Sequence, residues 1–320
     1  MQKQSVPPKG LQKQFTQPDG WVWDYMVNED GAILRHGLLA EHRNPIANII
    51  IRGGLSEMTE KYFETIRDLD ELGYNCYSME SRGEGGSERY LSDPSKRHSL
   101  GFGRDKRDLL HYIARYVPDN APRVILAHSM GALPALLAIR DEPDAFQKAV
   151  LTAPLMGFED PRAKGFEWAL ALMPPIRSLR ESYIPGNGPW RPQNAPDRTQ
   201  HPPQTYSSHP TRMYLHENWM EANPNLRIGG PTKGLIAHAS KAIMTLRCPG
   251  AIESIKTPIR VFSAGLEQRV SNTAIFNMAA RLKTAPPLIH LTDAKHDILL
   301  ETDDIRSFVL KKINSFSRLR

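Results

Sequence analysis

Residues 124–139 read VILAHSMGALPALLAI, an apolar run interrupted by a histidine, a serine and a glycine. Its first part is typical of a buried strand, and residues 130–140 are typical of a helix. A buried strand or helix does not need this cluster, whereas a sharp turn from strand into helix can present a serine. Because Ala127 and Gly131 are small residues two positions before and after Ser129, the stretch predicts a turn that exposes a nucleophilic serine.

The rest of the chain bears on a second interpretation, in which Ser129 only caps a buried helix. A serine nucleophile needs a histidine base and an acid, and on a strand-turn-helix site the order along the chain is serine, acid, histidine. Glu267 follows a predicted strand at 259–263, and His296 follows another at 288–291. We therefore predict a triad of Ser129, His296 and Glu267, with Asp293 and Asp297 as the other candidate acids. The alternative for Glu267 is a solvated loop carboxylate.

Two backbone N–H groups are candidate donors to the oxyanion of an ester intermediate. One belongs to Met130, at the start of the helix that follows Ser129. The other belongs to Gly54, because Arg52-Gly53-Gly54 follows a predicted strand at 46–51 and glycines allow close approach of the backbone. An ordinary tight turn is the alternative at this position.

Strands alternate with helices in most of the chain, which predicts a mostly parallel α/β sheet with helices on both faces. This alternation stops between residues 155 and 247, a region with 12 of the 26 prolines and three of the five tryptophans. The same region holds 11 Lys and Arg against 7 Asp and Glu, or +4 of the net charge of +6. We predict a core of residues 1–154 and 248–320, with residues 155–247 inserted as a mainly helical and irregular cap.

Composition excludes several classes of function. No run of five Lys or Arg, zinc-ligand spacing or RNA-binding aromatic motif occurs, so no nucleic-acid partner and no metal is predicted. Two cysteines, an N-terminus without an apolar segment and the lack of a long apolar run predict a cytoplasmic protein. The basic charge leaves two alternatives open: a merely solvated surface, or attraction to an anionic substrate or membrane, with peripheral binding at the inner membrane face.

Several motifs together resemble the bacterial lysophospholipase and monoacylglycerol lipase branch of the α/β hydrolases. That family typically has His-Gly after an early strand, then D-x-R-G-x-G-x-S, G-H-S-M-G-G and a C-terminal H-E-x-x-x-E. The chain carries Arg52-Gly53-Gly54, ESRGEGGS at 80–87, AHSMGA at 127–132 and HDILLE at 296–301. NLRIGGPTKG at 225–234 resembles the lysophospholipases in particular. The similarity extends from about Asp19 to the C-terminus.

The resemblance implies an α/β-hydrolase fold and an ester hydrolase that acts through an acyl-enzyme on Ser129, without a cofactor. Its substrate would be a lysophospholipid or a monoacylglycerol. A small-ester esterase, a proline-releasing aminopeptidase and a binding protein without catalysis remain alternatives, and the oligomeric state is open. The chain departs from the family pattern at Arg52 for histidine, Glu80 for aspartate, Ala127 for glycine and Glu267 for aspartate.

Overall fold

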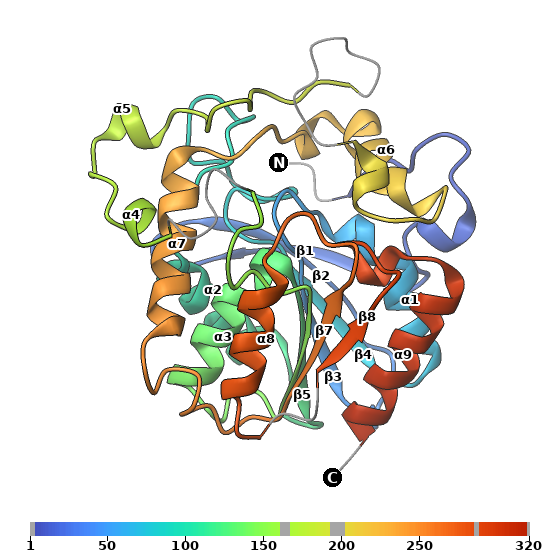
Figure 1. Ribbon diagram of the computed structural model, residues 1–320. Coiled ribbons are helices and arrows are strands. Elements are labelled where there is room, and N and C mark those ends of the chain that lie inside the picture. The colour runs from blue at the N-terminus through green and yellow to red at the C-terminus, as the bar shows by residue number, and fades with distance from the viewer. Residues whose placement is uncertain (1–3, 161–166, 193–201, 285–287, 319–320) are drawn as a thin grey trace.

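A single sheet forms the centre of the molecule, in a computed structural model that describes residues 4–160, 167–192, 202–284 and 288–318. Within these residues eight strands lie in the spatial order β1-β2-β4-β3-β5-β6-β7-β8 (Figure 1). β2 pairs antiparallel with β1 and β4, and every other pair is parallel. The strands are β1 (Val22–Val27), β2 (Ile33–Leu39), β3 (Asn48–Arg52), β4 (Asn75–Met79), β5 (Arg123–His128), β6 (Lys148–Thr152), β7 (Ile259–Ala264) and β8 (Ile289–Leu291).

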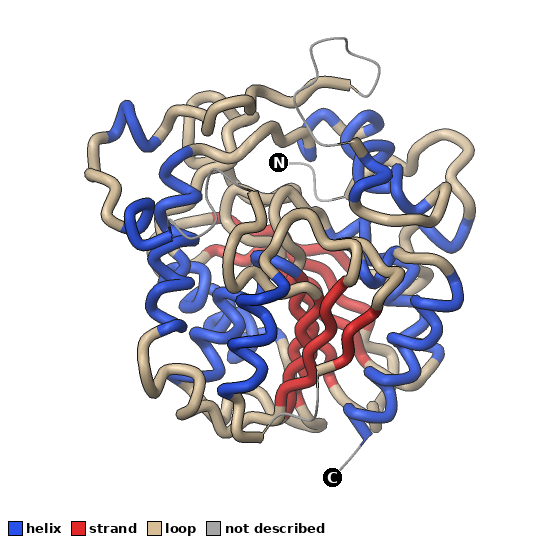
Figure 2. Tube along the Cα trace, viewed as in Figure 1, coloured by secondary structure: helices blue, strands red, loops and turns tan. Residues whose placement is uncertain are grey.

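Helices cover both faces of this sheet, as predicted (Figures 1 and 2). One face carries α1 (Phe63–Glu71) and α9 (Asp303–Arg318). The other carries α2 (Phe102–Tyr116), α3 (Ala132–Asp141), α7 (Lys233–Arg247) and α8 (Asn272–Arg281). Because the central strands are covered on both sides, all of β3 and nearly all of β5 are buried, and their middle residues are apolar.

The N-terminal hairpin of β1 and β2 was not predicted from the sequence. β1 is an edge strand in which most positions are half-buried or exposed, so it has no clean alternation of apolar and polar residues. Its partner strand contains Gly37, where a Cβ would lie 2.2 Å from the Trp21 ring. The hairpin therefore depends on a close aromatic contact that periodicity alone does not indicate.

The segment predicted as a cap is mostly irregular in the part of it that the structure describes, and residues 161–166 and 193–201 lie outside that part. Its helices are α4 (Glu167–Ala171), α5 (Arg177–Arg180), α6 (Leu215–Ala222) and α7. α7 packs beside α2 and α3, and its apolar residues join the same hydrophobic core as the sheet. The boundary of the cap at residue 247 stays a prediction.

None of the helices in the described part of the chain combines the length and the apolar character that crossing a bilayer requires.

Candidate active site

Ser129 occupies a strained turn between β5 and α3. Its backbone φ is +50°, a left-handed conformation that non-glycine residues rarely adopt. The turn also requires Gly131, because a Cβ there would lie 2.4 Å from the carbonyl oxygen of Gly53. Ala127 is fully buried. Gly131 thus has the steric role that the sequence predicts for it, and the role of Ala127 stays a prediction.

The three side chains predicted as a triad are in contact. His296 Nε2 lies 2.9 Å from the Ser129 hydroxyl, and His296 Nδ1 lies 2.8 Å from Glu267 Oε2. Ser129 follows β5, Glu267 follows β7 and His296 follows β8. Since these strands are parallel, their carboxyl ends reach one edge of the sheet, which brings together residues up to 167 positions apart.

Glu267 is fixed by its own loop as well as by His296. Its Oε1 accepts hydrogen bonds from the backbone N–H groups of Gln268 at 2.9 Å and Arg269 at 2.7 Å, and its side chain is 1% exposed. Burial raises the pKa of this carboxyl, but the charge and hydrogen bond of His296 and the backbone donors outweigh it, so the pKa is lowered. A glutamate therefore reaches the histidine where the family usually has an aspartate.

The pKa of His296 is raised above its ordinary value of 6.5. Burial opposes the charged imidazolium, but the charge of Glu267 and its hydrogen bond have the larger combined effect, with a further contribution from Asp297. His296 can therefore accept a proton from Ser129 while Glu267 stabilises the resulting cation.

Part of the predicted cap holds the loop that carries His296. The N–H of Asp297 donates to the carbonyl of Tyr206 at 2.8 Å, and the Ser207 hydroxyl donates to the carbonyl of Leu300 at 2.7 Å. The Glu301 carboxylate is fully buried and accepts the N–H groups of Lys295 and Ser208. The glutamate of the HDILLE motif thus joins this loop to the cap segment at 206–208.

The structure differs from expectation at one of the two predicted oxyanion donors. Gly54 does lie against Ser129, since a Cβ at Gly54 would be 2.9 Å from Ser129 Cβ. Its N–H, however, donates to the Glu57 carboxylate, so it can turn to an oxyanion only after leaving that partner. Met130 is the second residue of the helical turn that begins at Ser129.

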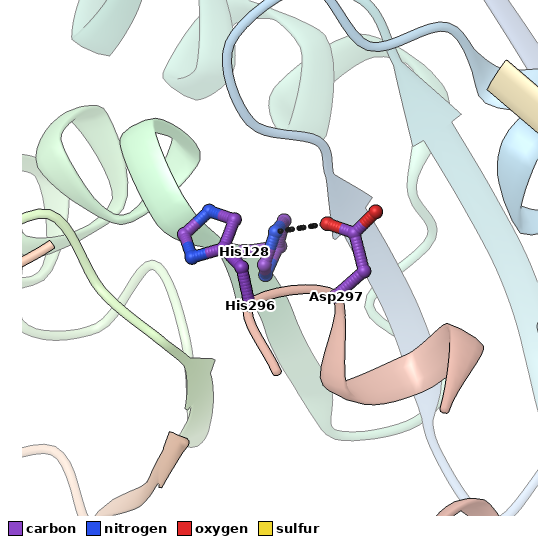
Figure 3. Close-up of side chains that lie close together, drawn as sticks. All are labelled: His128, His296 and Asp297. Atoms are coloured by element: carbon purple, nitrogen blue, oxygen red, sulfur yellow. Dashed lines mark ion pairs between the residues drawn. The ribbon is translucent and has the colours of Figure 1, made fainter. Parts of the chain in front are cut away.

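A buried group of charged side chains lies next to Ser129 and His296, and it was not predicted from the sequence. Glu57 and Lys61 form an ion pair, and the Lys61 ammonium also lies 2.8 Å from Asp297 Oδ2. His128 Nε2 is 3.3 Å from the other Asp297 oxygen (Figure 3). The only sequence pattern that could have indicated this ion pair is the i, i+4 spacing of Glu57 and Lys61. This spacing is usually found on a solvated helix face.

His128, His296 and Asp297 also lie close enough to share one cation, with ligand atoms within 4.8 Å of one another. Two observations speak against that use. Both ring nitrogens of His296 already face Ser129 and Glu267, and Asp297 faces a positive ammonium. This cluster is better explained as a buried ionic group than as a metal centre.

A cavity of about 480 Å³ lies between α4, α7 and α8. Its apolar lining includes Met156, Phe158 and Met278, and its polar lining includes Arg247 and Arg281. Met156 is next to Leu155, whose N–H donates to the Ser129 carbonyl at 3.0 Å. The segment that follows β6 therefore runs from the serine turn to this cavity.

Comparison with known proteins gives one family and a consistent set of relatives. The family model described as "Serine aminopeptidase, S33" (Hydrolase_4) matches residues 43–303. A probable lysophospholipase L2 of Haemophilus influenzae is 29% identical over 270 residues, covering 84% of this chain and 82% of that protein. Lysophospholipase L2 of Escherichia coli is 29% identical over 293 residues, covering 87% and 81%.

Solved structures share the fold at low identity. A soluble variant of monoglyceride lipase from Saccharomyces cerevisiae, in complex with a substrate analogue, has a TM-score of 0.73 at 16% identity, covering 97% of this chain and 98% of that one. The monoacylglycerol lipase of Paleococcus ferrophilus has a TM-score of 0.66 at 15% identity, covering 90% and 98%. The predicted α/β-hydrolase fold and the resemblance drawn from the motifs are confirmed.

Proposed function

The chain belongs to the serine aminopeptidase S33 family of hydrolases, and we propose that it cleaves the carboxylic ester bond of single-chain lipids. The enzyme class is the one predicted from the sequence, a carboxylic ester hydrolase similar to lysophospholipases. The observation that carries the proposal is the continuous contact from Ser129 through His296 to Glu267.

The proposed reaction proceeds by two acyl transfers. His296 takes the proton of Ser129 as Oγ attacks the ester carbonyl, and the Met130 N–H donates to the oxyanion. His296 then gives the proton to the leaving alcohol, which departs as the acyl-enzyme forms. Water next transfers a proton to His296 and attacks the acyl carbon. As the bond from that carbon to Ser129 Oγ breaks, His296 returns the proton to Oγ, which releases the carboxylic acid and regenerates the free serine. Glu267 remains ionised throughout and stabilises the imidazolium.

Lysophospholipids and monoacylglycerols are the proposed substrates because relatives named lysophospholipase L2 match most of this chain. The cavity of about 480 Å³ has the volume of a small-molecule site, but Ser129, His296 and Glu267 are not among the residues that line it, so the substrate class rests on the relatives. Two-chain phospholipids are expected to be poor substrates, because a cap of this size would restrict entry. A small-ester esterase is the alternative.

The name of the family, serine aminopeptidase S33, favours a second candidate, an aminopeptidase. Such an enzyme needs a carboxylate free to bind the substrate amine. Near Ser129 the buried carboxylates of Glu57 and Asp297 are already paired with Lys61. These contacts support the esterase over the peptidase.

Contact with an anionic membrane is the second part of the proposal. Trp168, Leu172 and Ile176 in and after α4 are 59%, 75% and 56% exposed, and Arg177 follows them on α5. An exposed Trp with aliphatic residues and a nearby arginine suits the interface of an anionic bilayer. Leu172→Ser should weaken sedimentation with anionic vesicles several-fold, whereas Val27→Ser, on the exposed edge strand β1, should not. Equal vesicle binding by both variants would contradict the proposed membrane contact.

The substrate test compares an anionic lysophospholipid, a monoacylglycerol and a short water-soluble ester. From about 0.01 M to about 1 M salt the screening length falls from about 30 Å to about 3 Å. We expect the anionic lipid to be cleaved fastest at low salt, with the advantage over the neutral lipid narrowing as salt rises. Equal rates at every salt concentration would contradict the electrostatic part. A clear preference for the short ester would contradict the lipid substrate and favour the alternative of a small-ester esterase.

A further inference from the structure

Four charged or titratable side chains lie buried together beside the proposed triad: Glu57, Lys61, His128 and Asp297. Their side chains are 5% to 9% exposed. The Lys61 ammonium contacts Glu57 and lies 2.8 Å from Asp297 Oδ2, so one cation faces two carboxylates. We call these four residues the clamp.

The members of the clamp belong to the segments that carry the reacting groups. Glu57 accepts the N–H of Gly54, and Lys61 lies one helical turn further along the chain. Asp297 is adjacent to His296, and the His128 and His296 rings are 4.8 Å apart between centroids. In Figure 3 the side chains of His128 and Asp297 face each other beside His296. The Lys61 ammonium thus joins the loop after β3 to the loop after β8.

Both carboxylates of the clamp are ionised at neutral pH. Burial raises the pKa of Glu57, but Lys61 and His128 lower it to about 2. Burial acts likewise on Asp297, and Lys61 and His128 hold its pKa well below the usual range. Removing the ammonium would leave two negative charges next to each other in a dry site. Stability alone does not require such a group, because packed apolar residues often replace a buried ion pair without loss.

We propose that Lys61 is a positioning residue: through Glu57 and Asp297 it keeps the Gly54 segment and His296 aligned with Ser129. The proposal rests on the proposed function only in that its consequence is measured on the acyl transfer of Ser129. Lys61 does not touch the reacting atoms. Its effect is transmitted by the two carboxylates.

The test uses Lys61→Met, Asp297→Asn and the double variant that carries both. Lys106→Met is the matched control, because Lys106 pairs with Asp141 at 2.6 Å on the surface of α2, where the side chains are partly exposed. We expect Lys61→Met to lower kcat by about 10²-fold with KM changed less than about threefold. Lys106→Met should stay within about twofold of wild type.

The pH profile gives a readout that a purely structural role would not move. Several titratable or charged groups lie around His296: Glu267 after β7, Asp297 after β8, Glu57 and Lys61 after β3, His128 in β5 and Tyr206 in the cap. Removing the positive charge of Lys61 favours the imidazolium, so the acidic limb should move to higher pH in Lys61→Met. Adding Asp297→Asn removes one negative charge, so the limb should return and at least tenfold of the rate should be recovered.

Labelling of Ser129 by a fluorophosphonate separates this proposal from the substrate assignment, because the probe reports the activated serine whatever the substrate. Wild type that is labelled but cleaves no lipid would end the lipid proposal and leave the clamp testable by labelling rates. Folded Lys61→Met that labels at the wild-type rate would overturn the clamp, and so would a loss that only follows the folded fraction. If Lys61→Met does not fold, Asp297→Asn, which leaves the Lys61–Glu57 pair neutral, should label about tenfold more slowly, and wild-type labelling would overturn the proposal.

Discussion

Two histidine–carboxylate pairs lie side by side in this molecule and differ in what surrounds them. In the first, Glu267 hydrogen-bonds His296 at 2.8 Å, and the other ring nitrogen faces Ser129. In the second, Asp297 lies 3.3 Å from His128, and the carboxylate also faces Lys61. The other ring nitrogen of His128 lies 3.1 Å from the carbonyl of Thr152. A carboxylate next to a histidine is therefore not sufficient evidence of a triad; the third group decides the role.

The largest expected effect on activity comes from removing the Ser129 hydroxyl, which contacts the histidine of the first pair. Ser129→Ala should lower ester hydrolysis on the order of 10⁶-fold, because no other hydroxyl contacts His296 among the described residues. Thermal unfolding should change little. Activity within tenfold of wild type in a steady-state assay would show that neither pair has been assigned correctly.

The next effect separates the two carboxylates. Glu267→Gln should lower turnover by about 10² to 10⁴, because the imidazole loses its orienting charge. Glu267 raises the pKa of His296 against the effect of burial. The acidic limb of the pH–rate profile should therefore move to lower pH in Glu267→Gln. A larger loss in Asp297→Asn than in Glu267→Gln would exchange the roles of the two acids.

A smaller effect concerns how stability depends on pH. The pKa of Glu57 is lowered from 4.5 to about 2, so this group contributes stability above about pH 4.5 that disappears as pH falls through about 2. The free energy of unfolding of wild type should exceed that of Glu57→Gln by about 3 kcal/mol near neutral pH, and this difference should shrink as pH falls toward 2. A gap that stays constant down to pH 2 would contradict the buried ion pair.

The smallest effect is expected at the third carboxylate that the sequence offered. Asp293 is exposed, and its carboxylate accepts a hydrogen bond from the hydroxyl of Thr292 at 3.3 Å. Asp293→Asn should keep turnover within about twofold of wild type. A tenfold loss of turnover in a normally folded Asp293→Asn variant would mean that Asp293 also takes part in the reaction.

Much of the fold could be predicted because its signals are local. The apolar run at 124–139 predicts a strand before Ser129 and a helix at 130–140, and the structure has β5 at Arg123–His128 and α3 at Ala132–Asp141. Parallel strands bring their carboxyl ends to one edge, so Ser129, Glu267 and His296 could be grouped without a structure. The edge hairpin of β1 and β2 could not be found in this way, because its residues are only partly buried.

The clamp could not be predicted, because its members look like surface residues in the sequence. Glu57 and Lys61 are charged and one helical turn apart, and their burial depends on a contact with Asp297, 236 positions beyond Lys61. The burial of the cap tryptophans could not be predicted either. Trp219 is buried, Trp190 is half-buried and Trp168 is exposed, and no sequence pattern distinguishes the three.

The most direct test of the account is the rate at which a fluorophosphonate labels Ser129 in wild type and in His296→Asn, with the modified peptide identified by mass. The account predicts labelling at Ser129 alone, at a rate that rises with pH through a midpoint above 6.5, the ordinary pKa of histidine. In His296→Asn the rate should fall by at least about 10³-fold. Labelling at another residue, or an equal rate in the variant, would contradict the claim that His296 activates Ser129.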